Sequence, residues 1–216
     1  MRAIMVPVKA LARAKSRLAP VLSPLERAAL SLALLEDVLD AALAAAGWET
    51  WVISPDEAVL EVAARRAAIP IPEAKPPLSA AVRQAEEEAA ERGVTTLAVL
   101  PADLPMLTAA ELSEALHTLG PVVLAPASSD GGTNLLLRRP PRAIPARFGP
   151  GSFAKHVDSA RSRRLPVSVV EAPGLAFDLD LPEHAARVVA GGGGRRTVGS
   201  LLELGVEERL ASLPRR

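Results

Sequence analysis

Three aspartates stand where they could hold a divalent metal ion. Asp103 follows the apolar run 97–100 and lies between two prolines, which stiffen the backbone that carries its carboxylate. Asp178 and Asp180 form an Asp-x-Asp pair, and on an extended segment the period of two directs both carboxylates to one face. Because Mg²⁺ prefers one or two carboxylates together with phosphate oxygens and water, these aspartates predict a magnesium site. The alternatives are that Asp103 caps a turn and that Asp180 is a helix N-cap.

A basic loop at residues 9–18 has the residue types that a triphosphate needs. It follows an apolar run at residues 3–8 and contains four cations, Lys9, Arg13, Lys15 and Arg17. Lysine offers a point charge to phosphate oxygens, and arginine offers a two-pronged donor. Two of the four lysines in the chain lie in this loop, which favours a nucleotide-binding loop over a solvated basic one.

A glycine-containing loop at residues 128–134 is a second candidate for ligand binding. Gly131 and Gly132 allow the backbone to approach a ligand closely. Thr133 and Asn134, the single asparagine of the chain, supply a hydroxyl and an amide as donors. A plain hairpin turn is the alternative interpretation.

A glycine-rich bend at residues 147–156 leads into a predicted helix with Ser152 as its N-cap. Free N–H groups and the helix dipole favour an anion at such a helix start, and the small Gly149 and Gly151 let the anion approach. The segment therefore predicts a phosphate-binding turn, with an ordinary helix start as the alternative.

The chain offers little for nucleophilic catalysis by a side chain. It has no cysteine and no Gly-x-Ser-x-Gly segment, and His117, His156 and His184 show no metal-ligand spacing. We interpret these three histidines as surface residues. Metal-assisted displacement at phosphorus remains, since it requires positioning and charge neutralisation more than covalent participation.

Strand-like and helix-like segments alternate along the chain. Continuous apolar runs indicate parallel strands that are covered on both faces, and they occupy residues 97–100, 122–125 and 135–137. Residues 3–8, 50–53 and 167–170 are further predicted strands. This rhythm predicts an α/β fold with a single doubly wound, mostly parallel sheet and helices on both faces. Ligands should gather at the carboxyl ends of its strands.

Capping residues define the predicted helix ends. Serine or threonine followed by glutamate three residues later marks helix starts at Ser23, Ser54 and Thr108. Gly47 and Gly93 are predicted to end the first helix and a helix at residues 79–92. The glycine run 191–194 is interpreted as a flexible joint, so that residues 1–190 form the catalytic domain and residues 191–216 a C-terminal helical appendage.

Composition excludes several classes of function. The 216 residues carry 25 basic and 25 acidic side chains, and a net charge of zero argues against a broad surface for nucleic acid or anionic membrane. The N-terminus lacks the apolar core of a signal peptide, and no apolar stretch is long enough to span a membrane. The expected compartment is the cytoplasm.

Together these motifs resemble the guanylyltransferases of coenzyme F-420 biosynthesis, which join GTP to phosphoenolpyruvate or 2-phospho-L-lactate. These enzymes are related to the molybdenum-cofactor and sugar-phosphate nucleotidyltransferases. The resemblance covers nearly the whole chain, and it is carried by Pro7-Val8-Lys9, Ala14-Lys15-Ser16-Arg17-Leu18, Pro101-Ala102-Asp103-Leu104-Pro105, Gly132-Thr133-Asn134, Phe148-Gly149-Pro150-Gly151-Ser152-Phe153 and Asp178-Leu179-Asp180.

The resemblance implies a fold like that of the nucleotide-diphospho-sugar transferases and a role for each motif. GTP would meet Pro7, Val8, Lys9, Lys15 and Arg17. The phosphorylated three-carbon acid would meet Thr133, Asn134, Gly149, Gly151 and Ser152. Mg²⁺ would be held by Asp103, Asp178 and Asp180, and Lys15, Arg17 and Asp103 would act in catalysis.

The implied reaction is attack by a phosphate oxygen of the acid on the α-phosphorus of GTP, with release of pyrophosphate. Phosphoenolpyruvate is the expected acid, with 2-phospho-L-lactate as the alternative. The sequence does not determine the oligomeric state, and a homodimer is one possibility. Where relatives often have asparagine at the start of the third helix, this chain has Ser79, so the residues that read guanine stay open too. The rival functions are another nucleotidyltransferase, acting on a sugar phosphate or a pterin, and a non-catalytic GTP-binding module.

Overall fold

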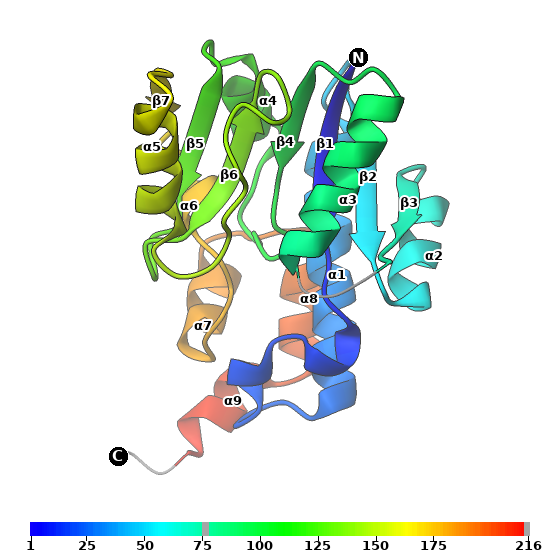
Figure 1. The fold of residues 1–216 in the computed structure, drawn as a ribbon. Coiled ribbons are helices and arrows are strands. Elements are labelled where there is room, and N and C mark those ends of the chain that lie inside the picture. Colours follow the sequence, from blue (N-terminus) through cyan, green and yellow to red (C-terminus); the bar gives the residue numbers. More distant parts are fainter. Residues whose placement is uncertain (75–77, 214–216) are drawn as a thin grey trace.

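The fold is a single seven-stranded sheet between two layers of helices (Figure 1). The structure is a computed structural model that describes residues 1–74 and 78–213. The strand order is β3-β2-β1-β4-β6-β5-β7. The strands are β1 (Arg2–Pro7), β2 (Glu49–Ser54), β3 (Ile69–Pro72), β4 (Thr96–Val99), β5 (Val122–Pro126), β6 (Thr133–Arg138) and β7 (Val167–Val169).

The predicted doubly wound, mostly parallel sheet is confirmed, with one antiparallel member. Strand β6 runs antiparallel to both of its neighbours, β4 and β5. The connection from β5 to β6 spans residues 127–132, which is too short for a parallel crossover of about a dozen or more residues. The chain therefore turns back as a hairpin. Strand β3, which the apolar runs did not predict, is an edge strand, where prolines such as Pro70 and Pro72 are tolerated.

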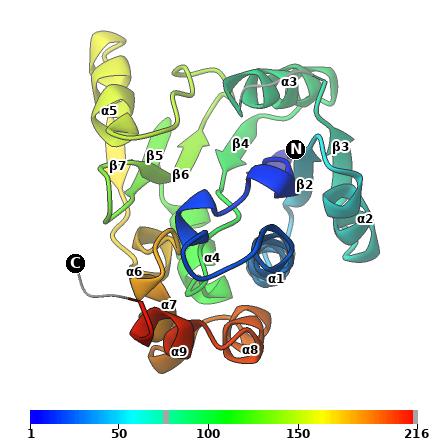
Figure 2. The same cartoon turned by 90° about the horizontal axis from the view of Figure 1, so that it is seen from below.

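Alternating side chains of β1 divide the core into two layers. Ile4 and Val6 pack with apolar residues of α1, α2 and α4 on one face of the sheet. Ala3 and Met5 pack with residues of α3 and α5 on the other (Figure 2). The main helices are α1 (Pro24–Leu43), α2 (Glu57–Arg65), α3 (Leu78–Glu91), α4 (Ala109–His117) and α5 (Ser152–Ser162).

Helix caps follow the prediction at two of the three starts. Ser23 and Thr108 each form a complete capping box, with Glu26 and Glu111 respectively. The prediction for Ser54 is wrong: this residue ends strand β2, and Asp56 caps α2 instead.

Of the two predicted helix ends and the predicted N-cap at Ser152, only the helix end at Gly93 agrees with the structure. Gly93 follows the end of α3 with a positive φ of 68°, as predicted. Helix α1 ends at Leu43, earlier than Gly47 suggests. Gly151, in the left-handed region with a φ of 66°, is the N-cap of α5, so Ser152 is its first helical residue.

The C-terminal part of the chain adds four short helices on the α1 side of the sheet. It contains α6 (Pro173–Ala176), α7 (Glu183–Ala190), α8 (Arg195–Glu203) and α9 (Val206–Ala211). The Asp37 carboxylate of α1 accepts hydrogen bonds from the backbone N–H groups of Arg196 and Thr197, which open α8. The glycine run 191–194 is also held by a hydrogen bond to the rest of the protein, since the Gly194 N–H donates to the Pro105 carbonyl at 2.6 Å. The division at residue 190 stays a prediction. Within the described ranges, no helix is long and apolar enough to cross a membrane.

Candidate active site

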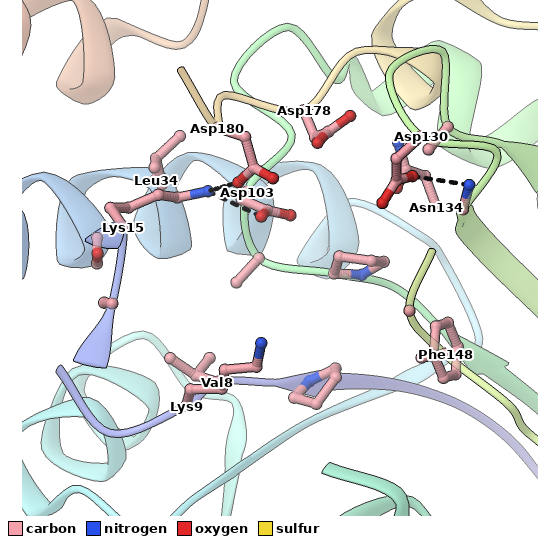
Figure 3. Close-up of a pocket in the computed structure, with 18 of the residues that line it drawn as sticks. Val8, Lys9, Lys15, Leu34, Asp103, Asp130, Asn134, Phe148, Asp178 and Asp180 are labelled. Carbon is pink, nitrogen blue, oxygen red and sulfur yellow. Dashed lines mark hydrogen bonds and ion pairs between the residues drawn. The ribbon is translucent and has the colours of Figure 1, made fainter. Parts of the chain in front are cut away.

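A cleft of about 410 Å³ opens at the carboxyl ends of β1 and β4 (Figure 3). Because β6 is antiparallel, its first residues lie at the same edge of the sheet as the last residues of β4. Every predicted site residue except Gly151 and Ser152 lines this cleft. Those that line it are Pro7, Val8, Lys9, Lys15, Arg17, Asp103, Thr133, Asn134, Gly149, Asp178 and Asp180.

Lys15 bridges two of the predicted metal ligands. Its ammonium group donates to Asp103 Oδ2 at 2.8 Å and to Asp180 Oδ1 at 3.2 Å (Figure 3). The residue has a left-handed backbone, with a φ of 48°, where the chain turns between the 3₁₀ helices η1 (Leu11–Arg13) and η2 (Ser16–Leu18). Burial alone would lower the pKa of Lys15, but the charges and hydrogen bonds of the two aspartates outweigh it and raise the pKa. The ammonium group is therefore charged at neutral pH.

Asp178 completes the acidic group from a more buried position. Its carboxylate accepts a hydrogen bond from Ser129 Oγ at 3.1 Å, and the residue is 8% exposed. Burial raises the pKa of Asp178, and the negative charges of Asp103 and Asp180 raise it further. The three aspartates thus share one electrostatic environment.

The acidic group is not arranged as a ready metal-binding cluster. Among residues 1–74 and 78–213, no three His, Cys, Asp or Glu side chains meet the geometry of a metal site. The alternative role for Asp180 as a helix N-cap is wrong, because Pro182 is the N-cap of α7 and supplies no side-chain cap. Asp180 instead pairs with Lys15 and, at 3.5 Å, with the exposed Arg17.

A β-bulge directs two consecutive residues into the cleft. The register between β5 and β6 shifts so that Ala125 faces Leu135 while Pro126 faces Thr133, which leaves Asn134 as the extra residue. On a regular strand Thr133 and Asn134 would point to opposite faces, whereas here both line the cleft. The loop between β5 and β6 is thus a hairpin turn. It also brings Thr133 and Asn134 to the wall of the cleft, where a ligand could meet them.

The amide nitrogen of Asn134 has no hydrogen-bond partner in the described part of the chain. The residue is only 5% exposed. A buried donor without a partner costs free energy, so the Asn134 amide is a donor available to a ligand in the cleft.

The start of α5 faces the hairpin rather than the cleft. The backbone N–H groups of Gly151 and Phe153 donate to the carbonyls of Asp130 and Gly131, and the N–H of Ser152 donates to that of Gly149. The Ser152 side chain is fully buried, and its hydroxyl donates to Thr133 Oγ1 at 3.0 Å. The first donors of this helix are therefore already used within the protein.

His156 is fully buried, so the prediction that it is a surface residue is wrong. Its Nδ1 lies 3.0 Å from Thr133 Oγ1, and its Nε2 accepts from the backbone N–H of Arg147 at 2.9 Å. Burial, followed by the charges of Arg138, Arg147 and Lys155, lowers the pKa of His156 to about 4. The spacing of four residues from Ser152, which places the two on one helix face, is the signal in the sequence that points to this position.

The other two histidines differ in their surroundings. His117 is exposed, as predicted, whereas His184 is half-buried beside the Asp-x-Asp pair. His184 Nδ1 lies 2.9 Å from the carbonyl oxygen of Asp178. It therefore contacts the backbone that carries two of the predicted metal ligands.

The fold is of the type found in nucleotide-diphospho-sugar transferases. The structure is similar to that of a putative nucleotide-diphospho-sugar transferase from Desulfovibrio desulfuricans G20, with a TM-score of 0.76. The match covers 97% of this chain and 99% of that one at 18% sequence identity. At this identity the likeness shows the fold alone.

The sequence identifies the family. The family model described as guanylyl transferase CofC like matches residues 1–215. A phosphoenolpyruvate guanylyltransferase from Rubrobacter xylanophilus is 44% identical over 87% of this chain and 93% of its own. A 3-phospho-D-glycerate guanylyltransferase from Phenylobacterium zucineum is 45% identical, over 88% and 91% of the two chains. A 2-phospho-L-lactate guanylyltransferase from Methanothermobacter thermautotrophicus is 38% identical, over 88% and 84%. The chain belongs to the CofC-like guanylyl transferase family and is an enzyme of the nucleotidyltransferase type.

Proposed function

We propose that this enzyme condenses GTP with phosphoenolpyruvate. A phosphate oxygen of the acid attacks the α-phosphorus of GTP, the bond from the α-phosphorus to the bridging oxygen of the β-phosphate breaks, and pyrophosphate leaves. The observation that carries the proposal is that one cleft brings together the cationic loop, the three aspartates and the donors of β6. No general base is required, because the attacking phosphate is already an anion at neutral pH.

The two sides of the cleft suit the two substrates. On one side, Pro7 and Val8 at the end of β1 and the cations Lys9, Lys15 and Arg17 would bind the nucleotide and its triphosphate. On the other side, the Thr133 hydroxyl, the Asn134 amide and the backbone at Gly149 would bind the acid. Gly151 and Ser152 lie behind this wall, so we assign them an indirect part in binding the acid.

Asp103, Asp178 and Asp180 supply the carboxylate oxygens that a divalent cation such as Mg²⁺ prefers, and they would hold it after moving from the arrangement described above, which does not meet the geometry of a metal site. The Lys15 ammonium already places a positive charge between Asp103 and Asp180, so this position accommodates a cation. When bound, the metal would offset negative charge on the reacting phosphates. A divalent ion would compete with Lys15 for the same oxygens and would leave the Lys15 ammonium free to pair with a phosphate.

The choice of acid rests on the relatives. Phosphoenolpyruvate and 2-phospho-L-lactate carry the same charged groups and differ only in whether the bond between the central carbon and the terminal carbon is double or single, so charge cannot distinguish them. A difference of methyl size in an apolar contact, for instance at Phe148, is worth only about 1–3 kcal/mol. The 44% identity to a phosphoenolpyruvate enzyme supports that acid, and the 3-phospho-D-glycerate enzyme adds a third candidate. We also assign the reaction to coenzyme F-420 biosynthesis in the cytoplasm.

Product analysis tests the proposal directly. Purified enzyme is supplied with GTP, magnesium and each of the three acids separately, and product masses and initial rates of pyrophosphate release are recorded. We expect the highest kcat/KM with phosphoenolpyruvate. A higher value with another acid would change the substrate but retain guanylyl transfer, and no product with any of them would contradict the proposed function. Light scattering of the same sample measures whether the enzyme is a homodimer.

Metal binding is measured separately from turnover. Mn²⁺ replaces Mg²⁺, and its binding to the enzyme without substrates is followed by electron paramagnetic resonance. We expect Asp103→Asn to weaken Mn²⁺ binding and Lys15→Met to strengthen it, because Lys15 competes for the same carboxylates. Unchanged affinity in both variants would place the metal elsewhere.

A further inference from the structure

The hydrogen-bond network behind Thr133 has a single arrangement of protons that leaves neither fully buried side chain, Ser152 or His156, with an unpaired hydrogen. The network joins Ser152, Thr133, His156 and the backbone N–H of Arg147, at distances of 2.9–3.0 Å. Three of these groups are enclosed, since the side chains of Ser152 and His156 are fully buried and Thr133 is 4% exposed. Buried donors require acceptors, so the position of each hydrogen can be derived in turn.

The backbone determines the histidine tautomer. A backbone N–H can only donate, so the Arg147 N–H occupies the lone pair of His156 Nε2. The neutral ring then carries its hydrogen on Nδ1, and that N–H donates to Thr133 Oγ1. The lowered pKa of His156 keeps the ring neutral at physiological pH.

The serine determines the direction of the threonine hydroxyl. Within the described residues, the Ser152 hydroxyl has Thr133 Oγ1 as its single hydrogen-bond partner. If Thr133 donated to Ser152, the Ser152 hydrogen would be buried without an acceptor. Ser152 therefore donates, and both lone pairs of Thr133 Oγ1 are occupied. The Thr133 hydrogen then has no acceptor among the described residues, and because Thr133 lines the cleft, we infer that this hydrogen is available to a ligand there.

We propose that His156, together with Ser152, is a positioning residue that makes the Thr133 hydroxyl a committed donor to an anionic oxygen of the acid substrate. With both lone pairs occupied, this hydroxyl can donate to the substrate but cannot accept from it. The site thereby favours a carboxylate or phosphate oxygen over a hydroxyl group at this point. This inference rests on the proposed function, because it takes Thr133 to be a contact of the acid.

The tautomer is tested first in the unaltered protein. The chain has three histidines, so ¹⁵N-histidine NMR can resolve each ring. We expect one ring to stay neutral between pH 6 and 8 with hydrogen on Nδ1 and none on Nε2, and its signals to disappear in the His156→Asn variant. A His156 ring with hydrogen on Nε2, or one that is charged in this range, would overturn the proposal whatever the substrates of the enzyme are.

A pair of variants then separates the two ring nitrogens. The amide of asparagine can replace Nδ1, whereas the longer glutamine reaches the place of Nε2 and lacks the donor to Thr133. We expect His156→Gln to raise KM for the acid about tenfold, corresponding to about 1.4 kcal/mol. His156→Asn should stay within about threefold of the unaltered enzyme, and KM for GTP should be unchanged in both.

A double-mutant cycle provides the control against a merely structural role. In a Thr133→Val background the hydroxyl is absent, so His156→Gln should have no further effect on KM for the acid. An equal tenfold rise in that background, or equal changes of KM for acid and GTP, would show that His156 only supports the fold. If the unaltered enzyme forms no product with any acid, the proposed function fails, while the NMR result still decides the tautomer.

Discussion

Acidification should destabilise this protein through His156, and the size of the effect follows from its burial. The ring is neutral and fully enclosed, and its Nε2 lone pair accepts from the Arg147 N–H. Protonation would turn that acceptor into a second donor facing a backbone N–H. The neighbouring charges of Arg138, Arg147 and Lys155 oppose protonation as well.

The sign follows from the two pKa values. The pKa of His156 is about 4 in the folded protein, against 6.5 for an ordinary histidine, so the unfolded chain binds more protons between these values. The free energy of unfolding is therefore highest above pH 6.5 and decreases as the pH falls towards 4. A shift of about 2.5 units at about 1.36 kcal/mol per unit gives a loss of about 3 kcal/mol at pH 4.

The assay compares the unaltered protein with His156→Gln, which lacks the titrating group. Urea unfolding is followed by tryptophan fluorescence at intervals from pH 7 to pH 4, and the fully buried Trp51 reports loss of the core. The difference in unfolding free energy between the two proteins should shrink by about 3 kcal/mol over this range, because other titrating groups are common to both. A difference that stays constant within about 0.5 kcal/mol would refute the reasoning.

Three further predictions concern other parts of the molecule. Asp103→Asn should lower turnover by about 10²–10³, whereas Asp158→Asn, on the exposed face of α5, should not; equal pyrophosphate release rates would remove Asp103 from the site. Asn134→Ala should raise KM for the acid without lowering Tm, since its amide nitrogen has no hydrogen-bond partner within the described chain; a lower Tm with unchanged KM would contradict this. Glu86→Gln should cost about 3–5 kcal/mol in urea unfolding, because it breaks the 2.5 Å pair with buried Arg138. Joint replacement by Glu86→Leu and Arg138→Met should restore most of that loss, and no recovery would argue against a buried ion pair.

Local patterns were sufficient for the class of fold and for most of the cleft. Continuous apolar runs predicted the central strands, because a strand covered on both faces has no polar side. The capping boxes at Ser23 and Thr108 were readable for a similar reason, since each involves contacts over only three residues. Asp103 could be located because a residue that directly follows a parallel strand lies at the ligand-binding edge of the sheet.

Other features depended on contacts between segments that are far apart in the chain. Lys15 meets Asp180 across 165 positions, and no local pattern predicts that the lysine bridges two carboxylates. The bulge at Asn134 arises from the pairing of β6 with β5. Because of it, the consecutive residues Thr133 and Asn134 both line the cleft, whereas a regular strand would direct their side chains to opposite faces. His156 resembles a surface residue among charged neighbours, yet the packing of α5 against the hairpin encloses it. Its hydrogen bonds to Thr133 and to the Arg147 backbone exist only once that packing has formed.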